Sequence, residues 1–172
     1  MNKTILSFIA TFALAIVARA DTTVKISDVH LCCGKCVKGV ETAIGTVPNA
    51  KAAVDKDAKT VAITAPDMAT AQKAVDALTA AGYFGKSDNA EVKLTDNSGA
   101  KDAKVAAITI KGTHLCCDKC VKGVDAALAD VKGITGNTAA KGAESFEIKG
   151  DFNAKEVMTA LEKAGYTGTV VN

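Results

Sequence analysis

The chain has 172 residues, and its 21 Lys and Arg nearly balance its 19 Asp and Glu, which leaves a formal net charge of +2. Both excess positive charges, Lys3 and Arg19, lie in the first 20 residues, so the rest of the chain is neutral, which excludes a basic nucleic-acid binder and a polybasic membrane-surface protein. A hydrophobic content of 48% excludes a disordered charged tail, and six Cys are too few for a disulfide-dense small protein of this length.

Residues 1–20 have the pattern of a secretory signal peptide. Lys3 precedes an apolar run from Ile5 to Val17, and Ala18-Arg19-Ala20 forms a small-x-small cleavage site before Asp21. The run is too short to span a membrane, since a spanning helix needs about 20 residues, and an uncleaved anchor is the less favoured reading. We therefore expect a periplasmic or secreted protein that is not inserted in the membrane after cleavage and whose thiols meet an oxidising compartment.

The rest of the chain consists of two copies of one sequence repeat. The eleven residues from His30 to Val40 recur from His114 to Val124, and only Gly34 and Asp118 differ between the two copies. Two copies are too few for a solenoid, so two tandem domains are the better interpretation. We expect a first domain at 21–95, a polar linker at 96–103 and a second domain at 104–172.

Each unit carries the same order of predicted elements. Alternating apolar residues predict strands around 24–26 and 108–110, and apolar residues at helical spacing predict helices over 37–47 and 121–131. Hairpins are predicted at 54–63 and 134–148, and second helices around 71–78 and 154–161, with Asn153 and Glu156 resembling a capping box. Gly82 and Gly165 stand where a left-handed helix stop is needed, and last strands are expected at 92–94 and 170–171.

This order favours an α+β fold with two tandem ferredoxin-like βαββαβ domains. Each domain would form a four-stranded antiparallel sheet with both helices on one face.

The six Cys and two His of the chain all lie in the two copied loops. Cys33 and Cys36, like Cys117 and Cys120, bracket the predicted start of a helix, where free backbone N–H groups and the helix dipole stabilise thiolates. Thiolate is the form that binds metal ions, so the two loops predict metal binding. The candidate ligands are the eight donors of the two loops, namely Cys33, Cys36, Cys117, Cys120, Cys32, Cys116, His30 and His114.

The strand, the Cys-x-x-Cys loop, the helix and the terminal Gly-Tyr resemble the heavy-metal-associated domain, a family that includes copper chaperones and a periplasmic mercury-binding protein. The resemblance covers nearly the whole chain after residue 20, twice. It implies metal ligation by Cys33 and Cys36 and by Cys117 and Cys120, with Tyr83 and Tyr166 near the metal. The family loop is Gly-Met-x-Cys-x-x-Cys, whereas here His and Leu replace Gly and Met, and Cys32 and Cys116 are additional.

Donor type limits the metal without fixing it. Two thiolates suit copper(I) or another soft ion, whereas three thiolates and one imidazole suit tetrahedral zinc. We expect copper(I) or zinc, one ion per domain. The additional Cys and His residues are alternatively packing thiols and ordinary polar side chains, and the two Tyr are alternatively packed at the edge of the core.

The favoured function is that of a non-enzymatic, exported metal-binding protein that carries, buffers or sequesters ions through its two loops. Its expected partners are the metal ion and a metal transporter or acceptor protein, and no nucleic acid. The alternatives are a thiol–disulfide redox protein, because Cys-x-x-Cys also serves that chemistry, and an interaction domain without metal. A Cys33–Cys36 disulfide is a further alternative for the resting state, although three Cys per unit leave one thiol over.

Overall fold

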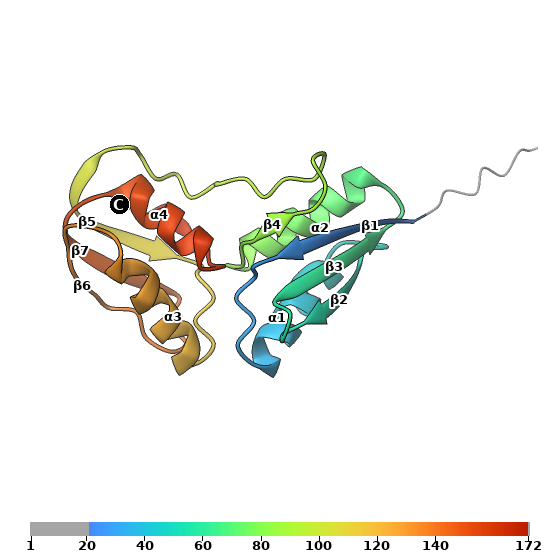
Figure 1. Ribbon diagram of the computed structural model, residues 1–172, viewed down its shortest axis with the longest axis horizontal. Helices are drawn as coiled ribbons and strands as arrows, with labels where there is room; N and C mark the ends of the chain where they lie inside the picture. Colours follow the sequence, from blue (N-terminus) through green and yellow to red (C-terminus); the bar gives the residue numbers. More distant parts are fainter. Residues whose placement is uncertain (1–20, 172) are drawn as a thin grey trace, which may run out of the picture.

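The computed structural model describes residues 21–171, so the predicted signal peptide lies outside the described part of the chain. Two four-stranded antiparallel sheets, each with two helices, lie side by side (Figure 1). The strand orders are β2-β3-β1-β4 and β6-β7-β5-β8, so the two units have the same topology. Each order is that of a βαββαβ unit, as expected from the repeat.

The first unit contains β1 (Thr22–Ser27), α1 (Gly34–Gly45), β2 (Lys51–Asp55), β3 (Thr60–Ala65), α2 (Met68–Ala80) and β4 (Lys86–Ser87). The second contains β5 (Lys104–Lys111), α3 (Asp118–Ala129), β6 (Ile134–Asn137), β7 (Ser145–Asn153), α4 (Ala154–Lys163) and β8 (Thr169–Val171). These elements confirm the predicted order. The domain boundaries themselves stay a prediction. None of the described helices is long and apolar enough to cross a membrane.

Alternation along the strands decides which face of each sheet the helices cover. Val24 and Ile26 of β1 are fully buried, whereas Thr23 and Lys25 between them are not. The buried residues of α1 and α2 recur at helical spacing and pack against this face. The second unit repeats the pattern, with Ile110 and Ile148 fully buried beneath α3 and α4. Each sheet is therefore apolar toward its helices and more polar on the other side.

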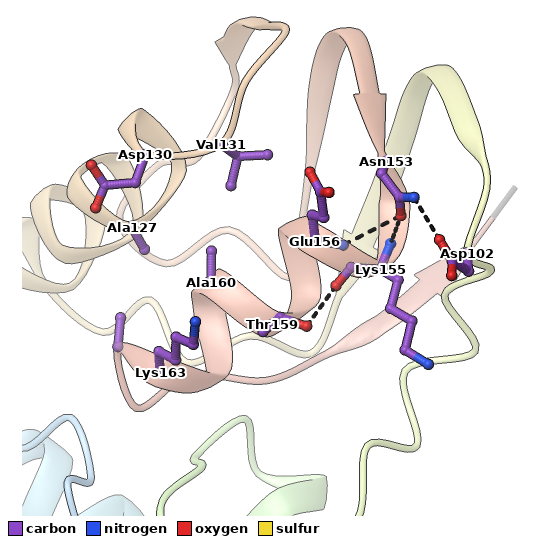
Figure 2. A pocket seen from close by; sticks show the side chains of 11 residues that line it. Asp102, Ala127, Asp130, Val131, Asn153, Lys155, Glu156, Thr159, Ala160 and Lys163 are labelled. Atoms are coloured by element: carbon purple, nitrogen blue, oxygen red, sulfur yellow. Dashed lines mark hydrogen bonds between the residues drawn. The ribbon is translucent and has the colours of Figure 1, made fainter.

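Several local predictions hold. Gly82 and Gly165 have φ of +85° and +86°, so each gives the left-handed turn that ends α2 or α4. The Asn153 half of the predicted capping box is present, since its side chain accepts hydrogen bonds from the backbone N–H of Lys155 and Glu156 (Figure 2). Both hairpins are present, and β6 and β7 pair with an irregularity between Ile134 and Gly136.

The prediction for the last strand of the first unit was wrong. β4 is Lys86–Ser87 and pairs with β1, whereas Val92 and Leu94 lie in no strand. Val92 is nevertheless fully buried. The Gln72 side chain of α2 holds this segment in place, because it forms hydrogen bonds with both the backbone N–H and the carbonyl of Lys93. The apolar residues at 92 and 94 therefore mark a segment that packs along α2 instead of a strand.

The segment between the two units continues along the second sheet. The carbonyl of Ser98 accepts a hydrogen bond from the backbone N–H of Val170 in β8, and Ser98 is 1% exposed. The backbone of Ala103 accepts a bond from Ala154 at the start of α4. The linker thus spans both units and passes along one side of the pair (Figure 1).

Candidate metal centre

The two cysteine loops lie opposite each other between the units (Figure 1). Cys33 and Cys117 are the N-cap residues of α1 and α3, with extended backbones, so each thiol stands at the beginning of a helix. Cys36 and Cys120 follow in the first helical turns and are fully buried. The N-termini of both helices therefore approach one place, where their free N–H groups favour negative charge.

All six sulfur atoms meet at this place. Within each unit, the two sulfurs of the Cys-x-x-Cys motif are 3.8 Å apart. Between units, Sγ of Cys32 lies 3.4 Å from that of Cys117 and 3.6 Å from that of Cys120. In the equivalent contacts of the second loop, Sγ of Cys116 lies 3.9 Å from that of Cys33 and 3.7 Å from that of Cys36. All six are free thiols, so the predicted alternative of a Cys33–Cys36 disulfide is not the state of this structure.

The donors form groups that combine both units. Three groups have ligand atoms within 4.8 Å of one another: Cys36, His114, Cys116 and Cys120; His30, Cys32 and Cys120; and Cys32, Cys33 and Cys117. Every predicted ligand belongs to at least one group. The ligand role of these residues stays a prediction, as does the expectation of one ion per domain. The structure brings together all eight donors, however, and each group takes donors from both loops.

A layer of aromatic rings lies beside the thiols. The hydroxyl of Tyr83 donates to the carbonyl of Cys36, at 3.1 Å, and lies 3.0 Å from Nε2 of His114 in the other unit. In the equivalent arrangement, Tyr166 donates to the carbonyl of Cys120 and its ring stacks on His30 at a centroid distance of 4.4 Å. Both Tyr are 1% exposed. They position the cysteine loops and link the two units.

Glycines make this close packing possible. A Cβ on Gly39 of α1 or on Gly123 of α3 would collide with the hydroxyl of Tyr83 or of Tyr166, respectively. The His rings also lie against these glycines, since Cε1 of His30 is 3.2 Å from the position of a Cβ on Gly123. Residues 82 and 165 approach the opposite unit as well: the carbonyl of Gly82 accepts from Thr167, and that of Gly165 from Phe84. Tyr83 and Tyr166 form an antiparallel bridge between the units.

The thiols differ in acidity because they share protons. The neighbouring Cys120 thiol lowers the pKa of Cys36, and the same interaction raises the pKa of Cys120. For Cys117, burial acts to raise the pKa, but backbone N–H groups of Cys120 and Lys119 and the thiol of Cys32 lower it to about 6. Burial raises the pKa of Cys116 to about 12. Because sulfurs this close repel one another when charged, the loss of a proton from one thiol opposes the loss of a proton from its neighbours.

The two His side chains have different surroundings. Burial lowers the pKa of His30, whose Nε2 is buried without a hydrogen-bond partner. A neutral imidazole with an unpaired buried nitrogen is an available metal donor, because an unsatisfied polar atom is costly to bury. His114 instead has the Tyr83 hydroxyl beside its Nε2.

Sequence reasoning identified the eight donors but missed the interface that joins them. The spacing within one loop describes one unit and contains no information on how two units face each other. Gly39 and Gly123 are signals that could have pointed to it, since a glycine in a helix interior costs stability and often marks a close approach of another group.

A separate groove lies between α3 and α4 of the second unit (Figure 2). Its lining includes Asp102, Asn153, Glu156 and Lys163 and no Cys or His. Asn153 is engaged in the helix cap, and it also donates to Asp102. This groove supplies no cluster of soft donors, so the cysteine interface is the better candidate site.

No protein-family model matches the chain, and no curated protein matches it. Among solved structures, the N-terminal soluble domains of Bacillus subtilis CopA are 14% identical, with 89% of this chain and 95% of that chain covered and a TM-score of 0.32. The water-soluble region of the P-type ATPase CopA from Bacillus subtilis is 18% identical, with 88% and 92% covered and the same TM-score. The first two RRM domains of yeast poly(U)-binding protein Pub1 match with 12% identity, with 87% and 98% covered and a TM-score of 0.26. Similarity at this level carries no argument about fold or function, so the interpretation rests on the geometry of this chain.

Proposed function

We propose that this protein is an exported binder of soft metal ions, copper(I) or zinc, which carries, buffers or sequesters the metal and catalyses no reaction. The observation that carries the proposal is the convergence of all six thiols and both imidazoles on one interface. Thiolate selects soft or borderline ions such as copper(I) and zinc over magnesium or calcium. The signal-like pattern of residues 1–20 is the support for export.

The arrangement of the thiols fits a bound ion better than a catalytic disulfide. A redox enzyme of the Cys-x-x-Cys type exposes one attacking sulfur to its substrate. Here the first sulfur of each motif, Cys33 or Cys117, is only partly buried, but each lies within 4 Å of a sulfur from the other loop as well as of its own motif partner. A pair that exchanges one disulfide needs no such contacts between the two loops, whereas a shared metal site does. Ion binding would involve release of thiol protons and ligand exchange, with a transporter or a thiol-bearing acceptor protein as the partner that supplies or takes the metal.

The test is metal content measured together with free thiols. The chain from Asp21 onward is purified without oxygen, and bound metal and reactive thiols are measured per chain. Bound copper or zinc with all six thiols protected is the expected result. The Cys33→Ser, Cys117→Ser double variant should lose the metal, whereas the Ser27→Ala variant, which changes a hydroxyl outside the cluster, should keep it. A metal-free protein that cycles a disulfide in glutathione buffers contradicts the proposal and favours the redox alternative.

A further inference from the structure

The six thiols are arranged as one polyhedron. Eight pairs of sulfurs are 3.4 to 3.9 Å apart, and Cys32–Cys33, Cys33–Cys117 and Cys36–Cys120 lie within 4.8 Å. Each sulfur thus has three or four sulfur neighbours. The pattern is that of a distorted octahedron in which Cys32 is opposite Cys116, Cys33 is opposite Cys120, and Cys36 is opposite Cys117.

Two faces of this polyhedron are trithiolate groups that share no residue. One is Cys36, Cys116 and Cys120, and the other is Cys32, Cys33 and Cys117. Together they use all six thiols, and each takes sulfur from both units. Neither group can form in one domain alone, so the structure does not divide the donors into one site per domain.

The distances between the sulfurs limit the coordination number of an ion bound among them. With a metal–sulfur bond of about 2.3 Å, two sulfurs are about 4.6 Å apart in a linear site and about 4 Å apart around a three-coordinate ion. The two sulfurs within each Cys-x-x-Cys motif are 3.8 Å apart, and the sulfur–sulfur contacts between units reach 3.9 Å. Around a tetrahedral ion the same bond length gives about 3.8 Å, so the separations disfavour a linear site and fit three- or four-coordinate ions. A three-coordinate copper(I) ion is complete with the three thiolates of one group, whereas a tetrahedral zinc ion needs a fourth ligand.

We propose that the two loops hold one shared polynuclear copper(I)–thiolate cluster that fastens the two units to each other. This inference rests on the proposed function. If each thiolate bridges two ions and each copper(I) takes three thiolates, six thiolates satisfy about four ions. Binding displaces one proton from each sulfur that is still a thiol, and each Cu–S bond uses a sulfur lone pair, so no oxidation occurs.

The surroundings suit the charge of such a cluster. Six thiolates with about four copper(I) ions carry an excess negative charge of roughly two. The N-termini of α1 and α3 both face the sulfurs, and each contributes a partial positive charge. Lys35 and Lys119 lie in the first turns of the same helices. Both units therefore contribute positive charge near the sulfurs, and Asp118 in the first turn of α3 offsets part of it.

The shared cluster has a functional consequence. Ions bound by thiolates of both loops cannot leave with one domain, so release requires many Cu–S bonds to exchange or the interface to open. Cys36 and Cys120 are fully buried, and the buried Tyr83 and Tyr166 donate hydrogen bonds to their carbonyls. Such a site is suited to storage or sequestration of copper(I) in preference to rapid one-ion delivery.

The experiment is an anaerobic copper(I) titration of the reduced chain from Asp21 onward, followed by native mass spectrometry. The expected result is a cooperative change from metal-free chains to single chains with about four copper ions and few intermediates. The Cys32→Ser, Cys116→Ser double variant keeps both Cys-x-x-Cys motifs, and it should bind fewer ions without cooperativity. The Ser27→Ala variant serves as the control and should load as the unmodified chain does.

The outcomes separate the two claims. Two ions per chain, bound one after the other and unchanged in the Cys32→Ser, Cys116→Ser variant, would overturn the shared cluster and leave soft-metal binding in place. If the same titration with zinc gives a single ion that copper(I) does not displace and that the His114→Ala variant loses, the cluster would also be overturned, since this result indicates the tetrahedral group of Cys36, His114, Cys116 and Cys120. No bound copper or zinc would overturn both claims.

Discussion

The hydroxyl of Tyr83 in the first unit lies 3.0 Å from Nε2 of His114 in the second, while it also donates to the carbonyl of Cys36. One side chain thus connects the helix that bears the buried thiol to the loop that supplies the opposite thiols. The equivalent pair of Tyr166 and His30 is stacked at 4.4 Å. The two cysteine loops are therefore held in register by a pair of aromatic contacts between the units.

Loss of the Tyr83 hydroxyl should weaken this connection. Tyr83→Phe keeps the ring and leaves the buried Cys36 carbonyl without this donor, so the free energy of unfolding of the reduced, metal-free chain should fall by about 1–2 kcal/mol in urea titrations. Combined with His114→Ala, the change should be non-additive by about 0.5 kcal/mol or more, because the two groups are in contact. Strictly additive effects would show that this pair does not couple the units.

Gly165 should tolerate no side chain. A Cβ there would collide with the backbone N–H of His30 and lie 2.7 Å from the carbonyl of Asp28, both in the other unit. Gly99 has a similar left-handed φ of +73° but nothing within 4 Å of the added Cβ, so it is a matched control. Gly99→Ala should cost only the backbone strain of about 1–2 kcal/mol, whereas Gly165→Ala should cost more and open the interface.

The readout for the glycine pair is the reactivity of the thiols together with thermal unfolding. In Gly165→Ala, the buried thiols of Cys36 and Cys120 should react faster with a thiol reagent, and the melting temperature should fall further than in Gly99→Ala. Equal effects of the two substitutions would mean that residue 165 does not depend on the packing between the units.

Glu162 should make the stability of the fold depend on pH. Burial and the nearby carboxylate of Asp96 raise the pKa of Glu162 to about 7, and its Oε1 is buried without a partner. Asp28, Lys86 and Lys163 line the same small hollow. Because the folded-state pKa is above the unfolded value of 4.5, stability should fall as the pH rises from about 4.5 to about 7 and then stay level.

The measurement is thermal unfolding at several pH values. Glu162→Gln should equal the unmodified chain near pH 4 and be more stable near pH 8, by less than about 1 kcal/mol because the carboxyl is partly exposed to solvent. The exposed Glu41 of α1 offers a control, since Glu41→Gln should shift the curve little at either pH. A Glu162→Gln variant that gains no stability above pH 7 would contradict the raised pKa.

Much of each unit was predictable because its apolar residues follow the periods of strands and helices. The internal repeat also identifies the correct position of β4. The offset of 83 residues that relates Tyr83 to Tyr166 aligns Lys86 and Ser87 in the sequence with Thr169 and Val170 of β8. The prediction of 92–94 followed hydrophobicity instead. Lys86 and Ser87 are polar, so only their pairing with β1 identifies them as a strand.

The site was predictable as a set of donors and not as an assembly. Eight soft donors in two loops indicate metal binding, because no other Cys or His competes with them. Whether Cys32 meets Cys33 or Cys117 depends on how Tyr83 and Tyr166 pack the two units together, and these contacts join residues more than 30 positions apart. Periodicity within one unit contains no signal for such packing.

X-ray absorption at the copper edge of the anaerobically loaded chain distinguishes a shared cluster from two separate sites. In a shared cluster, copper has about three sulfur neighbours and further copper ions at short distance, because thiolates of both loops bridge the ions. Copper with two sulfur neighbours and no neighbouring metal would contradict it, because that result describes two independent Cys-x-x-Cys sites.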